Sequence, residues 1–164
     1  MKLYTVDTAY IDYLKIFQPR IWENVENHRL RPYVGVILSI GKLKYYAPLS
    51  SPKPKHQKMF DRLDFIRLEH KGRLVAVINL NNMIPVADEL VTKIDIKSLT
   101  DMRYKDLLNV EMIDIRRKQA IIVKNANSIY SKVTKFADES RNARLVSLCY
   151  DFLLLEQKLQ EYKV

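Results

Sequence analysis

The hydrophobic residues of this chain change their spacing near residue 100, and that change limits the folds open to it. Residues 33–40 and 43–49, on either side of Gly41, follow the period of two that is typical of β-strands and predict a hairpin. Residues 65–69 and 74–78 predict a second strand pair that turns through 70–73, and residues 83–86 predict a short edge strand that tolerates Pro85. The first part of the chain is therefore expected to form an antiparallel sheet or a small barrel, entered through a polar loop over 18–30.

Beyond residue 100 the apolar residues recur every three or four positions, which predicts helices. One stripe runs from Tyr104 to Phe136 and is expected to divide into two or more segments, with a possible break at 125–128. A second stripe predicts a C-terminal helix from about Ser140 to Tyr162. Because no Gly, Ser or Pro-rich linker separates these parts, the chain is expected to be a single domain over 1–164, of the α+β class with C-terminal helices packed on the sheet.

Several classes of protein are excluded by residues that the chain lacks. A single cysteine, Cys149, rules out an internal disulfide and a cysteine-rich zinc site, and it is most simply a buried apolar residue. The three histidines have no carboxylate at metal-ligand spacing, and the three glycines are isolated, so we expect no metal, no cofactor and no nucleotide-triphosphate site. No signal peptide and no run of about 18 apolar residues is present, which predicts a cytoplasmic protein.

The charge balance points to a polyanionic partner. The chain has 28 Lys and Arg against 19 Asp and Glu, a net charge of +9. Most of the surplus lies in residues 51–73 (7 basic against 3 acidic) and 101–135 (8 against 4). Concentrated positive charge attracts phosphate backbones, so nucleic-acid binding is favoured over a merely solvated basic face. Neither segment joins a bulky apolar face, which argues against a membrane surface.

One short segment carries the residue types that phosphate chemistry needs. Residues 50–56, Ser-Ser-Pro-Lys-Pro-Lys-His, directly follow a predicted strand, and the two prolines hold the residue before each of them extended. In a β conformation Ser51, Lys53 and Lys55 share one side, whereas in polyproline II they diverge; the sequence leaves both open. Hydroxyl and ammonium donors suit metal-independent RNA cleavage, in which the substrate supplies its own 2′-OH nucleophile. The alternative is a solvated loop that only ends the strand.

The order of several short strings resembles a known family. They are residues 1–5 and 10–15, Val34-Gly35-Val36-Ile37-Leu38, Tyr46-Ala47-Pro48-Leu49-Ser50-Ser51-Pro52-Lys53, residues 79–86, residues 104–108, Ile115-Arg116 and the final Leu-rich helix. In this order and at this length the chain resembles the type III toxin endoribonucleases of the ToxN/AbiQ kind. The resemblance runs nearly end to end.

The resemblance implies a fold, a reaction and a partner. The expected fold is a compact antiparallel β-barrel-like sheet, an extended form of the MazF/Kid-like fold. The expected reaction is metal-independent RNA cleavage that leaves a 2′,3′-cyclic phosphate and a 5′-hydroxyl, in bacterial phage defence by abortive infection or in plasmid maintenance. The expected partners are cellular or phage mRNA and a repeat-derived RNA pseudoknot that the toxin processes and that then inhibits it in a closed toxin–RNA hetero-oligomer, with no membrane or DNA partner.

The resemblance also implies roles for particular residues. Ser51 matches the family's essential serine, Lys53 its active-site lysine and Ser50 a position that is commonly threonine. These serines are expected to orient the phosphate and the 2′-OH, while Lys53 stabilises the pentacoordinate transition state or protonates the leaving 5′-oxygen. Arg31, with Arg29 as competitor, matches a basic residue and acts as a charge clamp because arginine does not deprotonate usefully. The family's tyrosine has no counterpart between residues 18 and 32, which leaves the general base open, with His28 as one substitute.

Further residues are expected to bind RNA through phosphate contacts or base stacking. The candidate polar contacts are Arg29, Lys55, His56, Lys58, Arg62, Arg116, Arg117 and Lys118, and the candidate stacking rings are Tyr33, Tyr45 and Phe60. The alternative is a non-catalytic RNA-binding protein on the same scaffold. A DNA-binding regulator is less favoured because no helix-turn-helix pattern occurs.

Overall fold

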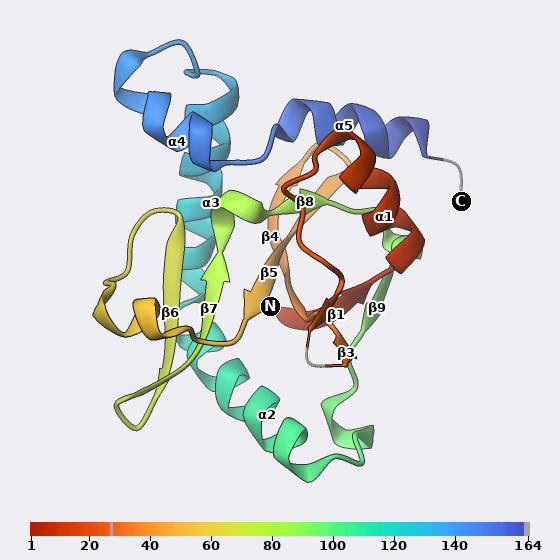
Figure 1. The fold of residues 1–164 in the computed structure, drawn as a ribbon, viewed down its shortest axis with the longest axis vertical. Helices are drawn as coiled ribbons and strands as arrows, with labels where there is room; N and C mark the ends of the chain where they lie inside the picture. The colour runs from red at the N-terminus through yellow and green to blue at the C-terminus, as the bar shows by residue number, and fades with distance from the viewer. Residues whose placement is uncertain (27, 163–164) are drawn as a thin grey trace.

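The computed structural model describes residues 1–26 and 28–162, and its centre is a seven-stranded sheet in which every pairing is antiparallel (Figure 1). The strands of this sheet are β1 (Lys2–Val6), β4 (Tyr33–Ile40), β5 (Leu43–Ser50), β6 (Phe65–His70), β7 (Arg73–Asn79), β8 (Ile84–Pro85) and β9 (Val91–Lys93). Strands β2 (Val25–Glu26) and β3 (Arg29–Leu30) form a separate small hairpin. The predicted strand pairs are thus confirmed, and the predicted loop over 18–30 contains one short hairpin.

The strand order is β6-β7-β5-β4-β1-β9, with β8 paired to β5 off this path. The end strands β6 and β9 do not pair with each other, so the sheet is open, and the expected barrel-like closure is wrong. Strand β9, one of the two end strands, has only three residues and therefore offers few backbone groups to pair with another strand. Helix α2 (Met102–Arg117) packs instead against β6 and β7 at the other end of the sheet.

The helices follow the predicted stripes but break at other places. The first stripe divides at Lys118, between α2 and α3 (Gln119–Thr134), where the backbone leaves the helical conformation with φ −92° and ψ 5°. The Lys118 ammonium donates to the Arg67 carbonyl of β6 at 2.6 Å. The expected break at 125–128 is wrong, since those residues lie inside α3 and the Asn127 side chain donates to the Val123 carbonyl at 2.9 Å.

The C-terminal stripe also forms two helices rather than one. A 3-10 turn η5 (Ser140–Asn142) leads into α4 (Ala143–Leu148), and α5 (Phe152–Glu161) follows after a bend. Asp151 starts α5 by accepting from the Leu154 backbone N–H at 3.0 Å, a polar cap that a continuous helix cannot use. Cys149, at the end of α4, is buried as expected.

Three elements near the N-terminus and the sheet edge were not predicted. Helix α1 (Thr8–Phe17) begins after Asp7, whose carboxylate accepts from the Tyr10 N–H at 3.0 Å. Strands β1 and β9 pair with each other, and β1 also pairs with β4. Short 3-10 turns complete the connections: η1 (Pro54–Lys58), η2 (Leu80–Asn82), η3 (Asp88–Leu90) and η4 (Ile96–Ser98).

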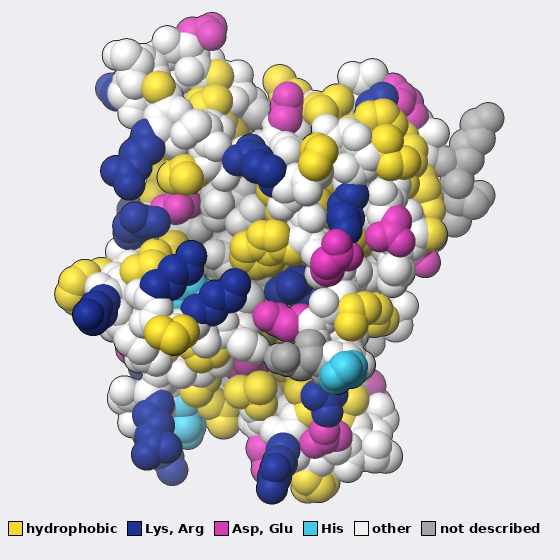
Figure 2. Space-filling model, in the orientation of Figure 1, with side chains coloured by type: hydrophobic (Ala, Val, Ile, Leu, Met, Phe, Trp, Pro, Cys, Tyr) yellow, Lys and Arg dark blue, Asp and Glu magenta, His cyan; other side chains and the backbone are white. Residues whose placement is uncertain are grey.

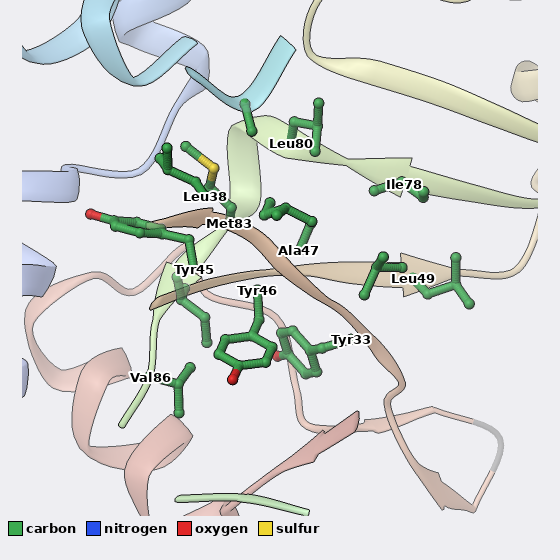
Figure 3. Packing of buried hydrophobic residues seen from close by; sticks show 14 of the residues in the cluster. Tyr33, Leu38, Tyr45, Tyr46, Ala47, Leu49, Ile78, Leu80, Met83 and Val86 are labelled. Carbon is green, nitrogen blue, oxygen red and sulfur yellow. The ribbon is translucent and has the colours of Figure 1, made fainter. Parts of the chain in front are cut away.

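The core lies where β4, β5 and β7 meet. Figure 3 shows residues of β4 and β5, among them Tyr45, Tyr46 and Leu49, in the same cluster as Ile78 of β7 and as Val86, which follows β8. Strand β5 contributes buried side chains along most of its length because it has β4, β7 and β8 as neighbours. Its last residue, Ser50, pairs with Val77 and is therefore held by the sheet. No helix of the described chain is long and apolar enough to cross a membrane.

Gly35 leaves room for a core tyrosine. A Cβ at this position would lie 2.1 Å from Cδ1 of the Tyr46 ring, and that ring is buried. We expect Gly35→Ala to lower the free energy of unfolding by roughly 1–3 kcal/mol or more, because a packed ring has to move. Urea unfolding measures this, with Gly41→Asn as the control, since a Cβ at Gly41 meets nothing within 4 Å and Asn tolerates its φ of 58°. Equal losses in the two variants would contradict the packing account.

Candidate functional site

Two consecutive serines at the end of β5 differ in their exposure to solvent. Ser50 is the last strand residue and is buried, and its hydroxyl accepts a hydrogen bond from the Asn79 side chain of β7 at 3.3 Å. Ser51 follows outside the strand and is exposed. The strand therefore fixes Ser50 rigidly and presents Ser51 to solvent at its rim.

The Lys53–His56 turn continues from Ser51. Lys53 is extended, with φ −105° and ψ 159°, and Pro54 begins η1. The Lys53 N–H donates to His56 Nδ1 at 3.1 Å, and the His56 N–H donates back to the Lys53 carbonyl at 2.8 Å. The sequence left a β conformation and a polyproline II conformation open for this segment. In the structure Lys53 is extended and Lys55 lies in the 3-10 turn η1, which is held by the two hydrogen bonds between Lys53 and His56.

His56 is a structural part of this turn. Its ring is only 6% exposed and packs at 5.2 Å from the Phe65 ring. Arg67 of β6 supports the same turn, because its guanidinium donates to the carbonyls of His56 and Gln57, at 3.2 and 3.3 Å, and to that of Met59. A direct RNA contact therefore has only the exposed edge of the His56 ring to use.

Arg31 binds the other side of β5 and is 7% exposed. Its Nη1 donates to Glu26 Oε2 at 3.0 Å and to the Leu49 carbonyl at 3.5 Å, and its Nε donates to the Glu23 carbonyl at 3.1 Å. Its guanidinium also lies 5.0 Å from the centre of the Trp22 ring. This side chain, together with the Leu49 N–H that donates to the Pro32 carbonyl at 2.9 Å, ties the loop before β4 to the end of β5.

Two hollows meet at Ser50. The lysine hollow, about 310 Å³, is lined by Trp22, Glu23, Glu26, Arg31, Ser50, Lys53, Lys55, His56 and Asn79. The Tyr104 slot, about 100 Å³, is lined by Glu26, Arg29, Leu30, Pro32, Leu49, Ser50, Ser51, Tyr104, Leu107, Leu108 and Glu111. All four predicted catalytic residues therefore line one hollow or the other, and Ser50 lines both.

The charge inside the lysine hollow is not balanced. Its two acids are already engaged, Glu26 with Arg31 and Glu23 with Lys15. Within the described residues, no ion pair involves Lys53 or Lys55. Figure 2 shows Lys and Arg side chains gathered over the segment that leads from β5 to β6. The hollow thus offers uncompensated positive charge to an anion such as a phosphate.

The other predicted polar contacts differ in how free they are. Lys55, Lys58 and Arg116 are exposed. Arg29 pairs with Asp101 and covers the Tyr104 ring at 4.7 Å. The remaining pairs are Arg62 with Asp64 at 3.6 Å, Arg117 with Asp114 at 2.5 Å, and Lys118 with Asp61 at 3.1 Å. Lys118 is mainly a structural tie between α2 and β6.

Two of the three predicted stacking rings are in the core. Tyr33 is 2% exposed, and Tyr45 is fully buried with its hydroxyl donating to Glu156 at 2.6 Å. Neither ring can stack on a base, so the assignment of Tyr33 and Tyr45 as stacking rings is wrong. The alternation along β4 and β5 shows which residues share a face of the strand, but it does not show which face is buried by other elements. Phe60 is 83% exposed and remains available.

Sequence reasoning missed the residues that shape the site from a distance along the chain. Arg67 lies in a strand, Tyr104 lies on a helix stripe that reads as core, and Glu111 is a polar residue of the same helix. Nothing in their local spacing pointed to the loop after β5, because only the packing of α2 and β6 brings them there.

Comparison with known proteins decides the family. The family described as "Toxin ToxN, type III toxin-antitoxin system" matches residues 2–160. The Endoribonuclease ToxN of Bacillus thuringiensis subsp. kurstaki is 31% identical over 166 residues, which cover 99% of this chain and 84% of the relative. This chain belongs to the ToxN/AbiQ family of type III toxin–antitoxin endoribonucleases.

Other ToxN/AbiQ proteins agree in sequence and fold. The Endoribonuclease AbiQ of Lactococcus lactis subsp. lactis is 27% identical over 174 residues, covering 99% of this chain and 89% of that protein. A solved structure from work on selective toxin inhibition by a non-coding RNA pseudoknot superposes with a TM-score of 0.88 at 30% identity, covering 98% of this chain and 96% of that one. The open sheet and its helices are therefore the ToxN/AbiQ fold.

The Lys53–His56 turn makes stability depend on pH. Burial lowers the pKa of His56, and the charges of Lys55 and Lys53 lower it further, so the folded protein holds the ring neutral with Nδ1 as acceptor. This contribution is complete above about pH 6.5, the ordinary value for histidine, and is lost as pH falls through the lower folded value. In His56→Asn the side-chain oxygen can replace Nδ1 as acceptor but cannot titrate.

We therefore expect the wild type to lose stability relative to His56→Asn between pH 7 and pH 5, as measured by urea unfolding. His28→Asn, at an exposed position with φ 63°, is the control. A stability difference between wild type and His56→Asn that stays constant over this range would contradict the assignment.

Proposed function

We propose that this protein is a metal-independent endoribonuclease toxin that cleaves RNA by attack of the 2′-OH, leaving 2′,3′-cyclic phosphate and 5′-hydroxyl ends. The observation that carries the proposal is the pair of hollows at the end of β5. Both include Ser50, one includes Ser51, and the other includes Lys53, which forms no ion pair among the described residues. In this reaction the 2′-oxygen loses its proton and bonds to phosphorus, while the 5′-oxygen leaves and takes up a proton. The protein has to orient the phosphate and stabilise its added charge.

Each side chain has a role in that step. The Ser51 hydroxyl at the rim orients the phosphate and the 2′-OH, and Ser50 supports the same position from inside the strand. The Lys53 ammonium stabilises the non-bridging oxygens of the pentacoordinate phosphorus, a contribution of roughly 3 kcal/mol when water is excluded. Arg31 is a positioning residue, because its guanidinium is engaged by Glu26 and by backbone carbonyls and holds the loop before β4 against β5.

We also propose that the antitoxin is RNA. The solved relative comes from work in which a non-coding RNA pseudoknot inhibits the toxin, and a second solved relative, with a TM-score of 0.86, comes from work on a processed non-coding RNA that regulates an antiviral system. In this chain Lys55, Lys58 and Arg116 are exposed and carry the charge that such an RNA requires. A repeat-derived pseudoknot would be cut at the lysine hollow and then remain bound, forming a closed toxin–RNA assembly.

The test is cleavage of a long RNA in EDTA. Ser51→Ala and Lys53→Met are expected to lower the rate by at least about 100-fold, because both side chains act mainly in the transition state. Ser39→Ala and Lys42→Met, at exposed positions in and after β4, are matched controls and should cut normally. Mass spectrometry of the ends should find the cyclic phosphate.

The same variants should bind repeat RNA within about tenfold of the wild type, because the lost interactions belong to the transition state. RNA that stays intact at high wild-type concentration, while still binding tightly, would overturn the proposal in favour of a non-catalytic RNA-binding protein.

A further inference from the structure

Glu111 is a buried acidic residue that the proposed function does not use. It lies in α2, is 4% exposed, and its Oε2 has no hydrogen-bond partner among the described residues. Burying a carboxyl without a partner costs stability. Asp114, one turn later on the same helix, differs in its partners. Its Oδ2 accepts from the Glu69 N–H at 2.7 Å, and its Oδ1, which also lacks a hydrogen-bond partner among the described residues, lies 2.5 Å from the Arg117 guanidinium.

The Tyr104 slot, which Glu111 lines, has the composition of a site for a flat, partly polar group. Six of its eleven lining residues are apolar or aromatic, namely Leu30, Pro32, Leu49, Tyr104, Leu107 and Leu108, and the other five are polar or charged. Its volume of about 100 Å³ suits one planar ring rather than a folded RNA element. Because Ser50 and Ser51 line it too, the slot opens beside the place assigned to the scissile phosphate.

We propose that the Tyr104 slot takes the nucleobase next to the scissile phosphate and that the Glu111 carboxyl hydrogen-bonds to the edge of that base. The proposal rests on the proposed function, since it assigns a specificity site to the same cleavage. RNA bases that are splayed out of a strand commonly lie against aromatic rings and are read along their edges. Glu111 lines the slot, so its carboxyl supplies a polar group able to read such an edge.

The charge of Glu111 decides which edge fits. Burial raises the pKa of Glu111 to about 8, and the other charged or titratable groups that line the slot are Glu26, Arg29 and Tyr104. At pH 7 the carboxyl is therefore mainly neutral and offers one donor beside one acceptor. A base edge with an adjacent acceptor and donor matches it.

Above pH 8 the carboxylate offers acceptors alone. It then favours an edge with two adjacent donors, as on guanine N1 and N2. We therefore expect the base preference at the cleavage site to change as the pH rises through about 8.

The experiment maps cleavage sites in a random-sequence RNA at pH 6.5 and pH 9 by sequencing the ends. The wild type should change its base preference at the flanking position between these two values. Glu111→Gln, which keeps a neutral donor and acceptor, should retain the low-pH preference at both. Glu111→Leu should weaken the preference about tenfold or more while unfolding at no lower temperature, because it removes an unpartnered buried carboxyl.

The control is Asp114→Asn, which removes a partnered carboxyl from the same helix. It should lower stability and leave the base preference unchanged. A purely structural role for Glu111 would also change stability and total rate without changing the preference. Identical preferences in the wild type, Glu111→Gln and Glu111→Leu at both pH values would overturn the slot assignment while leaving the cleavage proposal intact.

If the wild type cuts nothing, the cleavage proposal fails separately. The slot proposal is then tested by binding. The wild type and the Glu111 variants each select tightly bound RNAs from the same random-sequence pool, and the base preferences of the selected RNAs are compared. A base preference that changes with pH in the wild type and is fixed in Glu111→Gln supports it, and equal selections overturn it.

Discussion

The pairing of β5 with three other strands is the constraint on which the rest of this structure depends. Strands β4, β7 and β8 hold β5 along its length, so the strand ends at a defined point, Ser50. Close approach of Gly35 to the Tyr46 ring locks the β4–β5 pair. Every residue assigned to the chemistry is positioned relative to that end, either by the chain that leaves it or by side chains that bind its carbonyls.

The site is rigid on one side and charged on the other. Arg31 donates to the Leu49 carbonyl from the loop before β4, and Arg67 holds the Lys53–His56 turn through backbone carbonyls. These two arginines are engaged by groups of the protein itself, whereas Lys53 and Lys55 form no ion pair within the part of the chain that the structure describes. The arginines therefore order the backbone around the hollow, and the two lysines supply its positive charge.

The sequence predicts the strands of the central sheet well because their alternation is long and Gly41 and Gly72 mark the turns. The β1–β9 pairing is beyond such reasoning, since strands of five and three residues carry too little pattern and their contact spans most of the chain. Sheet closure is likewise a property of the edges, and no local signal tells that β6 and β9 stay apart. The helix breaks were misplaced because Lys118, between α2 and α3, contacts β6, and Asp151 caps the start of α5 in the middle of a continuous apolar pattern.

The same distinction between local pattern and packing applies to the candidate site. Ser50, Ser51 and Lys53 lie in one short segment and could be found from residue types and family resemblance. Tyr33 and Tyr45 could not be told from surface rings, because alternation gives the face of a strand but not what covers it. Glu111 is a polar position beside the predicted apolar stripe, and only the packing of α2 against β6 and β7 places it in the lining of a slot that includes two serines.

A crystal structure of the protein with an RNA that carries a single 2′-deoxy nucleotide at the cut site tests the central claim most directly, because that RNA binds but has no nucleophile. The account predicts that the phosphate following this nucleotide lies at the end of β5, with its non-bridging oxygens within hydrogen-bond distance of the Ser51 hydroxyl and the Lys53 ammonium. A phosphate held elsewhere, with Ser51 and Lys53 directed into solvent, would contradict the account.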